Sequence, residues 1–194
     1  MPPFDRTGLL VLDDVFGVDD LEALTGTIEA LEFESQDYGR AVISRRERAT
    51  SESPIIPDLL WRRIGHLLPP MGSFFDGGPG TPRLDPPVHE WEAVGCNPRS
   101  RAYRYGPGAA FSEHEDEPWR PEPGVRSLLT VLVYLPVGGC EGGETVVDGT
   151  VVPVVDGRVV VFDHGLLHEG RPVERGRKLV LRSDVVARPI ASAG

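Results

Sequence analysis

The chain has 194 residues, 40% of them hydrophobic and 26% charged, which is the composition of a folded protein with one sizeable core. Its 20 Lys and Arg stand against 30 Asp and Glu, a net charge of −10 without any basic stripe, so nonspecific binding to nucleic acid or to an anionic membrane is not expected. No apolar run reaches membrane-spanning length, and Asp5, Asp13 and Asp14 around the first apolar run argue against a signal peptide.

Residues 1–100 read mainly as helices and loops. Residues 8–16 form an apolar run that predicts a strand. A helix then begins at Val18 or at the aspartates that follow it, which suit a helix N-terminus, and runs to about residue 33 with Leu and Ile at helical spacing. A second helix is predicted over residues 57–68, where prolines stop it. Residues 71–87 are rich in Gly and Pro and predict a surface loop or lid.

From residue 101 onward the pattern changes to short β segments. Turn signals containing glycine separate predicted strands over residues 101–105, 110–114, 127–135, 144–147, 158–162 and 178–186. Helices followed by strands predict an α+β fold whose β part is a sandwich or jelly roll, with the N-terminal helices packed on one sheet. One domain is expected over residues 1–194, with 1–100 as mostly helical and loop support and 101–188 as the jelly-roll core.

The segment His114-Glu115-Asp116 suggests a metal site. On a β-strand, residues i and i+2 point to the same face, so His114 and Asp116 can reach one ion together. A third ligand from a distant strand would complete a face of two histidines and one carboxylate, and His168 lies in a second histidine-containing stretch. Such a face holds Fe(II) and leaves positions open for a chelating co-substrate and for O2. His164 competes with His168 but fits a turn better.

Further motifs occur around this triplet in a fixed order. They are Tyr105-Gly106-Pro107-Gly108, a strand with Thr130 and Tyr134-Leu135, Gly142-Gly143-Glu144-Thr145, and Lys178 ten residues after His168. In this order and spacing, residues 101–186 resemble the Fe(II)/2-oxoglutarate-dependent dioxygenases, specifically their prolyl 4-hydroxylase-like branch. Pro136 departs from the asparagine that this branch usually has there.

The resemblance implies a double-stranded β-helix with a metal at its open end. His114, Asp116 and His168 would be the iron ligands. Lys178 matches the position that binds the far carboxylate of 2-oxoglutarate, and Arg182 stays open as a second or alternative cation because it faces the same way along the strand.

Three more residues are expected beside the co-substrate. Tyr105 and Tyr134 match family positions whose hydroxyls help to hold it, and ordinary core packing remains the alternative for both. Thr130 is four residues from Tyr134 on one strand, so the two share the inward face.

The resemblance also implies the reaction. Fe(II), 2-oxoglutarate and O2, with ascorbate as an optional reductant, would hydroxylate an unactivated C–H bond and release succinate and CO2. Asp116 favours hydroxylation, because related halogenases lack this carboxylate. A non-catalytic jelly-roll binding protein and a cupin-like metal protein that uses no keto acid are the hypotheses from other classes.

The expected substrate is a small molecule or a free amino acid, with a peptidyl residue such as proline as the alternative. Trp119 is a candidate for packing against it, and Arg48, Arg101 or Arg120 for pairing with a carboxylate. The charged run from Arg45 to Arg48 reads as a solvated face or, within a lid, as a grip for an anionic substrate.

The chain has two cysteines, Cys96 and Cys140, and no CxxC spacing. This pattern predicts neither a disulfide framework nor a zinc knuckle, and it favours a reducing cytoplasm.

Overall fold

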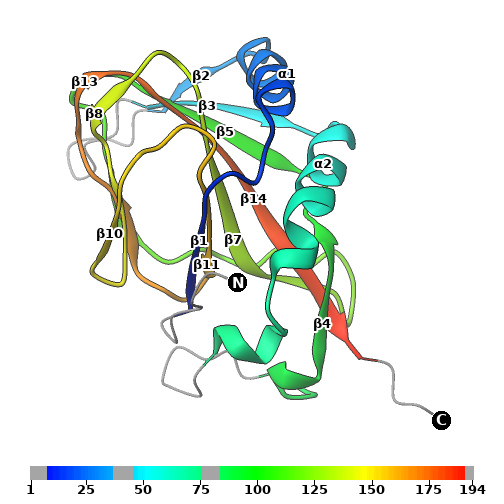
Figure 1. Cartoon of the computed structure of the whole chain (residues 1–194). Helices are drawn as coiled ribbons and strands as arrows, with labels where there is room; N and C mark the ends of the chain where they lie inside the picture. Colours follow the sequence, from blue (N-terminus) through cyan, green and yellow to red (C-terminus); the bar gives the residue numbers. More distant parts are fainter. Residues whose placement is uncertain (1–7, 37–45, 76–83, 191–194) are drawn as a thin grey trace.

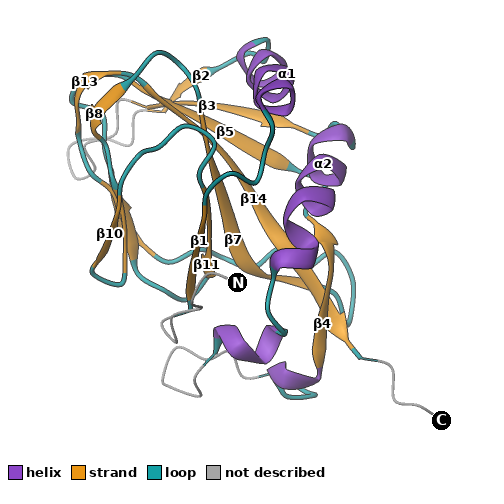
Figure 2. Ribbon diagram, in the orientation of Figure 1, coloured by secondary structure: helices purple, strands orange, loops and turns teal. Residues whose placement is uncertain are grey.

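The computed structural model describes residues 8–36, 46–75 and 84–190. It is rich in β-strands, with two helices on one side of a large sheet and shorter strands on the other (Figures 1 and 2). Among the described residues, no helix is long and apolar enough to cross a membrane.

The helices are α1 (Val18–Glu29) and α2 (Ile55–Ile64), with short 3-10 turns at Gly65–Leu67, Met71–Phe74 and Val88–Glu90. The strands are β1 (Leu9–Leu12), β2 (Glu34–Gln36), β3 (Arg46–Ser51), β4 (Trp91–Cys96), β5 (Ser100–Tyr105), β6 (Phe111–His114), β7 (Arg126–Leu135), β8 (Cys140–Gly142), β9 (Thr145–Val147), β10 (Thr150–Val152), β11 (Val159–Asp163), β12 (His168–Gly170), β13 (Val173–Gly176) and β14 (Lys178–Pro189).

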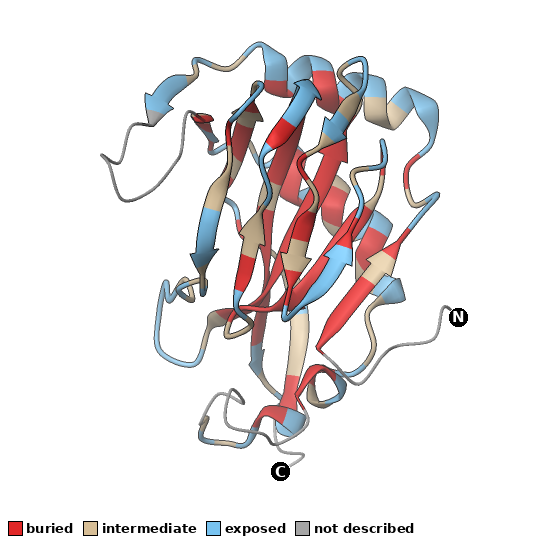
Figure 3. Ribbon diagram, turned by 90° about the vertical axis from the view of Figure 1, so that its left-hand side faces the viewer, coloured by how far each residue is buried: buried red, intermediate tan, exposed pale blue. Residues whose placement is uncertain are grey.

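The described strands form a large sheet of eight strands in the order β1-β11-β7-β14-β5-β3-β2, with β4 also paired to β14. A second sheet runs β10-β9-β12-β6, and β13 pairs with β8. Figure 3 views the molecule from the side of β8, β10 and β13, and the large sheet behind them is coloured mainly as buried. This two-sheet arrangement confirms the predicted jelly roll.

The central strand β7 separates two cores, because successive side chains of a strand point to opposite faces. Leu129, Val131 and Val133 pack in the cluster that includes the helices. Leu132 and Tyr134 belong to the cluster between the two sheets.

Both N-terminal helices pack on the outer face of the large sheet, as predicted (Figure 1). Leu24 and Ile28 of α1 and Ile56, Leu60 and Ile64 of α2 are buried in the cluster that contains the outward-facing residues of β7. Apolar burial of this kind is what holds an amphipathic helix in place.

The helix boundaries differ from the sequence-based ones. α1 ends at Glu29, before the predicted residue 33, because the chain straightens toward β2 and the Phe33 ring lies 3.9 Å from the Arg104 guanidinium carbon. α2 begins at Ile55 and contains Pro57 in its first turn, where the missing N–H is not needed.

The predicted loop or lid at residues 71–87 is partly structured. It begins with a 3-10 turn whose Met71 and Phe74 side chains are buried in the helix-side core. Residues 76–83 lie outside the described residues.

The sequence pattern missed β2, β3, β4, β8, β10, β12 and β13. Most of these strands are short. β3 begins with the charged run Arg46-Glu47-Arg48, which the sequence pattern assigns to solvent. In the structure Arg46 and Arg48 face the space between the sheets, and residues 1–100 contribute β1 to β4 to the large sheet.

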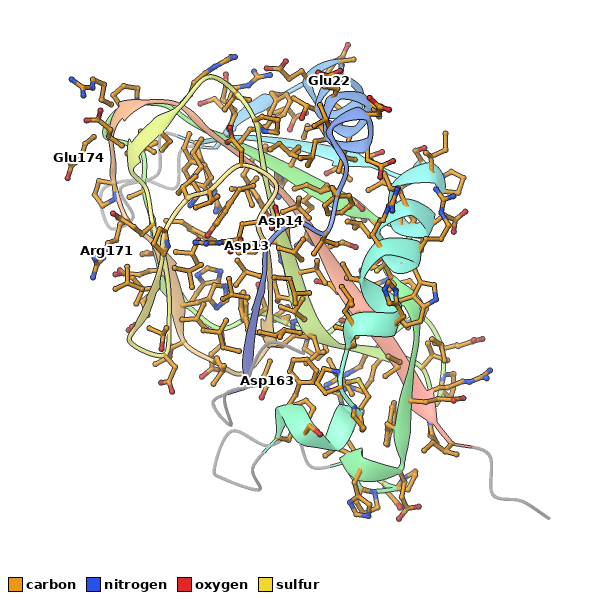
Figure 4. All side chains as sticks on the ribbon, viewed as in Figure 1. Asp13, Asp14, Glu22, Asp163, Arg171 and Glu174 are labelled. Atoms are coloured by element: carbon orange, nitrogen blue, oxygen red, sulfur yellow. The ribbon has the colours of Figure 1, made fainter. Side chains whose placement is uncertain are left out.

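One ion pair joins the residue that follows β1 to the residue that precedes β11. Asp13, labelled in Figure 4, follows β1 and accepts two hydrogen bonds from Arg158, from Nε at 2.7 Å and from Nη2 at 2.9 Å. This paired geometry lowers the pKa of Asp13 and orients β1 against β11.

Candidate active site

A cavity of about 480 Å³ lies between the two facing sheets. Along β14 the residues Lys178, Val180, Arg182 and Asp184 all line it, because every second residue of the strand points inward. Lys178 is only 4% exposed. A buried cation therefore forms part of the cavity wall.

His114, Asp116 and His168 meet in this cavity. β6 pairs with β12 so that His114 lies directly opposite His168. Asp116 follows β6, and its backbone N–H donates to the carbonyl of His164 at 2.9 Å. One ligand atom of each of the three residues lies within 4.8 Å of the others, which is close enough for all to bind one ion.

Backbone hydrogen bonds set the orientation of both imidazoles. Nδ1 of His114 lies 2.9 Å from the carbonyl of Ser112, and Nδ1 of His168 lies 2.9 Å from the carbonyl of Leu166. A carbonyl only accepts, so each Nδ1 carries the hydrogen and each Nε2 keeps its lone pair. The two Nε2 atoms lie 3.8 Å and 3.5 Å from the carboxylate oxygens of Asp116.

The protonation states also suit a metal ion. Burial lowers the pKa of His114 and of His168, which favours the neutral imidazoles that bind metals. Burial alone would raise the pKa of Asp116, but Arg182, His168 and Thr130 outweigh it and lower that pKa. Two imidazole nitrogens and one carboxylate therefore fit Fe(II).

A chain of hydrogen bonds positions the Asp116 carboxylate. Thr130 Oγ1 donates to Asp116 Oδ2 at 2.5 Å and lies 2.8 Å from His164 Nδ1, and His164 Nε2 lies 2.9 Å from Ser127 Oγ. The backbone N–H of Trp119 donates to Ser127 Oγ at 2.8 Å. Because the Thr130 hydroxyl donates to the carboxylate, its oxygen accepts from Nδ1–H of His164. Nε2 of the neutral imidazole then accepts from the Ser127 hydroxyl.

His164 therefore lies in a turn, as predicted, but is buried and does not join the three candidate ligands. Sequence reasoning missed its contact with Thr130 and the part played by Ser127. Thr130 and Ser127 are three residues apart, a spacing that predicts opposite faces of a regular strand, yet both side chains contact His164.

Replacing Thr130 by valine should weaken metal binding by ~10- to 100-fold, because groups that orient a metal ligand have effects of this size. The change keeps the side-chain shape but removes the hydrogen bond to Asp116 and leaves His164 without an acceptor. Anaerobic Fe(II) titration would measure it, with the exposed Thr150→Val as the control. Equal affinities in the two variants would contradict the positioning role of Thr130.

Arg182 contacts the metal-ligand side of the cavity. Its Nη2 lies 2.9 Å from Asp116 Oδ1 and 3.3 Å from Asp184 Oδ1, and Asn97 donates to the other oxygen of Asp184 at 2.8 Å. Arg182 faces inward as predicted, and its guanidinium lies on Asp116. Its expected contact with the co-substrate carboxylate stays a prediction.

Lys178 occupies the buried end of the cavity. Its Nζ donates to the carbonyl of Gly143 at 2.6 Å and lies 3.4 Å from Thr145 Oγ1, which accepts a hydrogen bond of 2.7 Å from the Tyr134 hydroxyl. Nζ also lies 5.3 Å from the ring centres of Tyr105 and Tyr134. Burial lowers the pKa of Lys178 to about 8. Such a buried ammonium fits a ligand carboxylate.

The aromatic candidates are both buried. Tyr134 is fully buried and Tyr105 is 6% exposed, and burial raises the pKa of each to about 12, so both hydroxyls stay protonated. Thr145 is a site residue that sequence reasoning did not single out, although the Gly-Gly-Glu-Thr motif contained it.

The sequence-predicted substrate residues divide between two places. Arg48, Arg101 and Trp119 line the cavity, whereas Arg120 lines a separate, open hollow. The solvated-face reading of the run from Arg45 to Arg48 fails for Arg46, which is 4% exposed and lies 3.3 Å from the Phe111 ring centre. Arg45 lies outside the described residues.

Comparison with known proteins agrees with this geometry. Residues 100–183 match the family model described as the 2OG-Fe(II) oxygenase superfamily. No curated protein matches the sequence.

Several solved structures share the fold. A prolyl-4-hydroxylase of Pseudomonas putida has a TM-score of 0.60 at 20% identity, over 95% of this chain and 94% of its own. A Trichoplax adhaerens prolyl hydroxylase in complex with a hypoxia inducible factor peptide fragment has a TM-score of 0.60 at 16% identity, over 92% and 84%. HygX of Streptomyces hygroscopicus, with nickel, 2-oxoglutarate and hygromycin B bound, has a TM-score of 0.53 at 18% identity, over 96% and 84%.

The matched segment begins at β5 and ends within β14, so it contains the three candidate ligands and Lys178. The match of residues 100–183 to the 2OG-Fe(II) oxygenase superfamily, together with the shared fold, supports a 2-oxoglutarate-dependent dioxygenase.

Proposed function

We propose that this dioxygenase hydroxylates a small molecule, with His114, Asp116 and His168 as the iron ligands and Lys178 as the anchor of 2-oxoglutarate. One observation carries the assignment: the three converging donor atoms and the buried ammonium line the same cavity. When bound, the iron and 2-oxoglutarate activate O2 for hydroxylation of a C–H bond, with release of succinate and CO2.

Different side chains of the cavity bind the metal and the co-substrate. His114 and His168 present lone pairs fixed by backbone carbonyls, and Asp116 supplies one negative charge. A ferrous ion held by these ligands would keep a net positive charge, which would suit the carboxylate and keto oxygens at one end of 2-oxoglutarate.

Lys178 meets the other carboxylate of 2-oxoglutarate. Tyr134 donates to Thr145, so the Thr145 hydroxyl keeps its own hydrogen for the incoming carboxylate. We assign Arg182 and Thr130 to Asp116 rather than to the co-substrate, because the guanidinium and the hydroxyl both contact that carboxylate.

A small substrate is supported by the size of the cavity. A volume of about 480 Å³ lies within the range of small-ligand pockets and leaves space beside 2-oxoglutarate for a compact molecule. Relatives of this fold include both a complex with a peptide and one with hygromycin B. A peptidyl substrate remains the alternative, because the Trichoplax relative is solved with a peptide fragment.

The proposed location is the cytoplasm. Cys96 and Cys140 are both free, as in proteins of reducing compartments.

The experiment that tests the function adds Fe(II) and 2-oxoglutarate to the protein without oxygen and looks for a visible charge-transfer band. Oxygen is then admitted and succinate is measured. A band followed by succinate supports the proposal. Neither band nor succinate would instead favour a jelly roll that only binds a ligand.

The affinity for 2-oxoglutarate should fall as pH rises above about 8, the pKa to which burial lowers Lys178. Below this pH the ammonium is charged and attracts the carboxylate; above it the neutral amine does not. The Kd should then rise roughly tenfold per pH unit. Titration of the anaerobic band from neutral to alkaline pH measures this, and Lys178→Arg, which keeps its charge, should flatten the profile. A flat wild-type profile would argue against Lys178 as the anchor.

A further inference from the structure

Three arginines line the cavity with no carboxylate partner in the part of the chain that the structure describes. Arg48 lies on β3, Arg101 on β5, and Arg99 in the turn before β5. We call them the arginine cluster. None of the three takes part in a salt bridge among the described residues, although Glu117 and Glu169 line the same cavity.

Several arginines elsewhere in the described structure have carboxylate partners. Seven other arginines form ion pairs with carboxylates: Arg63, Arg104, Arg158, Arg175, Arg177, Arg182 and Arg188. The chain has 30 acidic residues against 20 basic ones. Among the described residues, however, no carboxylate forms a salt bridge with the arginine cluster.

Strand pairing places like charges side by side. Arg101 lies directly opposite Arg182 across β5 and β14. Arg48 lies opposite Tyr103 and therefore diagonal to Arg101 on the same face, a spacing of roughly 7–8 Å in a sheet. Like charges directly opposite each other destabilise a sheet. Asp116 and Asp184 offset the charge of Arg182, whereas the structure describes no carboxylate partner for Arg48 or Arg101.

The proposed co-substrate does not satisfy this charge. One end of 2-oxoglutarate is assigned to the metal and the other to Lys178, while Arg182 already contacts Asp116 and Asp184. The arginine cluster is therefore left for a second ligand that carries its own negative charge.

We propose that the substrate is a small anion whose carboxylate or phosphate group is bound by Arg48, Arg101 and Arg99. This inference rests on the proposed function and names the substrate class of the same site. Arg101 neighbours Arg182, whose Nη2 lies 2.9 Å from the candidate iron ligand Asp116. The carbon that is hydroxylated therefore lies only a few bonds from the anionic group.

Direct binding tests the arginine cluster independently of turnover. Anaerobic protein is first saturated with Fe(II) and 2-oxoglutarate, which fills the Lys178 end, and inorganic phosphate and acetate are then titrated separately by calorimetry. Arg48→Gln with Arg101→Gln should weaken binding of the preferred anion about tenfold or more. The matched control is Arg104→Gln on the same strand, whose guanidinium pairs with Glu47 on the other face.

The outcomes of the binding test are distinct. Tighter binding of phosphate than of acetate assigns the site to phosphate groups, and the reverse assigns it to carboxylates. Failure of both anions to bind, or equal binding by the wild type and the double variant, would overturn the proposal.

A substrate panel supplies the second test. Pairs of carboxylic acids with their amides, and of phosphate esters with their parent alcohols, are assayed for succinate and for a gain of one oxygen atom in mass. Only the charged member of a pair should stimulate turnover, and stimulation by the neutral member to the same extent would refute an anionic substrate. Loss of the charge-transfer band would contradict the proposed function instead, while the calorimetric result would still decide whether the arginine cluster binds anions.

Discussion

Replacing Asp116 by alanine should reduce succinate formation by at least ~10³-fold, which corresponds to about 4 kcal/mol of transition-state stabilisation. The change removes the only carboxylate among the three converging ligands and leaves two neutral imidazoles. It also leaves Arg182 and Thr130 without the group that they contact. Initial rates of succinate release measure the loss.

The matched control for this variant is Glu113→Ala. Glu113 is exposed on β6, next to His114 and on the opposite face of the strand. It should keep wild-type activity. An Asp116→Ala enzyme that retained more than about one tenth of the activity would contradict the ligand assignment.

Lys178→Ala should raise the Kd of 2-oxoglutarate by ~10²-fold, the size expected when a buried charge-assisted contact is lost. The affinity for Fe(II) alone should stay the same, because Lys178 contacts Gly143 and Thr145 rather than the metal ligands. Folding should not suffer, since the change removes a 4% exposed ammonium that the described structure does not pair with a carboxylate.

The control for Lys178→Ala is Arg177→Ala, an exposed neighbour that pairs with Glu29 outside the cavity. Anaerobic titration of the charge-transfer band gives the Kd for each variant. If Lys178→Ala binds 2-oxoglutarate as tightly as the wild type, Arg182 becomes the better candidate for the carboxylate.

Much of the fold was readable from local patterns. Helices followed by short strands with glycine turns between them predicted an α+β fold with a sandwich or jelly roll, and the family resemblance implied the double-stranded β-helix. β3 was missed for a physical reason. Its charged residues appear solvent-exposed in a sequence, but Arg46 and Arg48 point into the polar cavity between the sheets.

Part of the candidate site could also be predicted from the sequence. The pairing of His114 with Asp116 follows from their spacing on one strand, whereas His168 entered through resemblance, because no local rule joins β6 to β12. Arg182 and Thr130 were correctly predicted to face inward. Which neighbour a long side chain reaches depends on strand register, and here the register brings both to Asp116.

The most direct test of the central claim is anomalous diffraction from crystals grown with Mn(II) in place of Fe(II) and with 2-oxoglutarate. One anomalous peak is expected within bonding distance of Nε2 of His114, Nε2 of His168 and a carboxylate oxygen of Asp116. A peak elsewhere, or a peak bound by only one of these side chains, would contradict the claim.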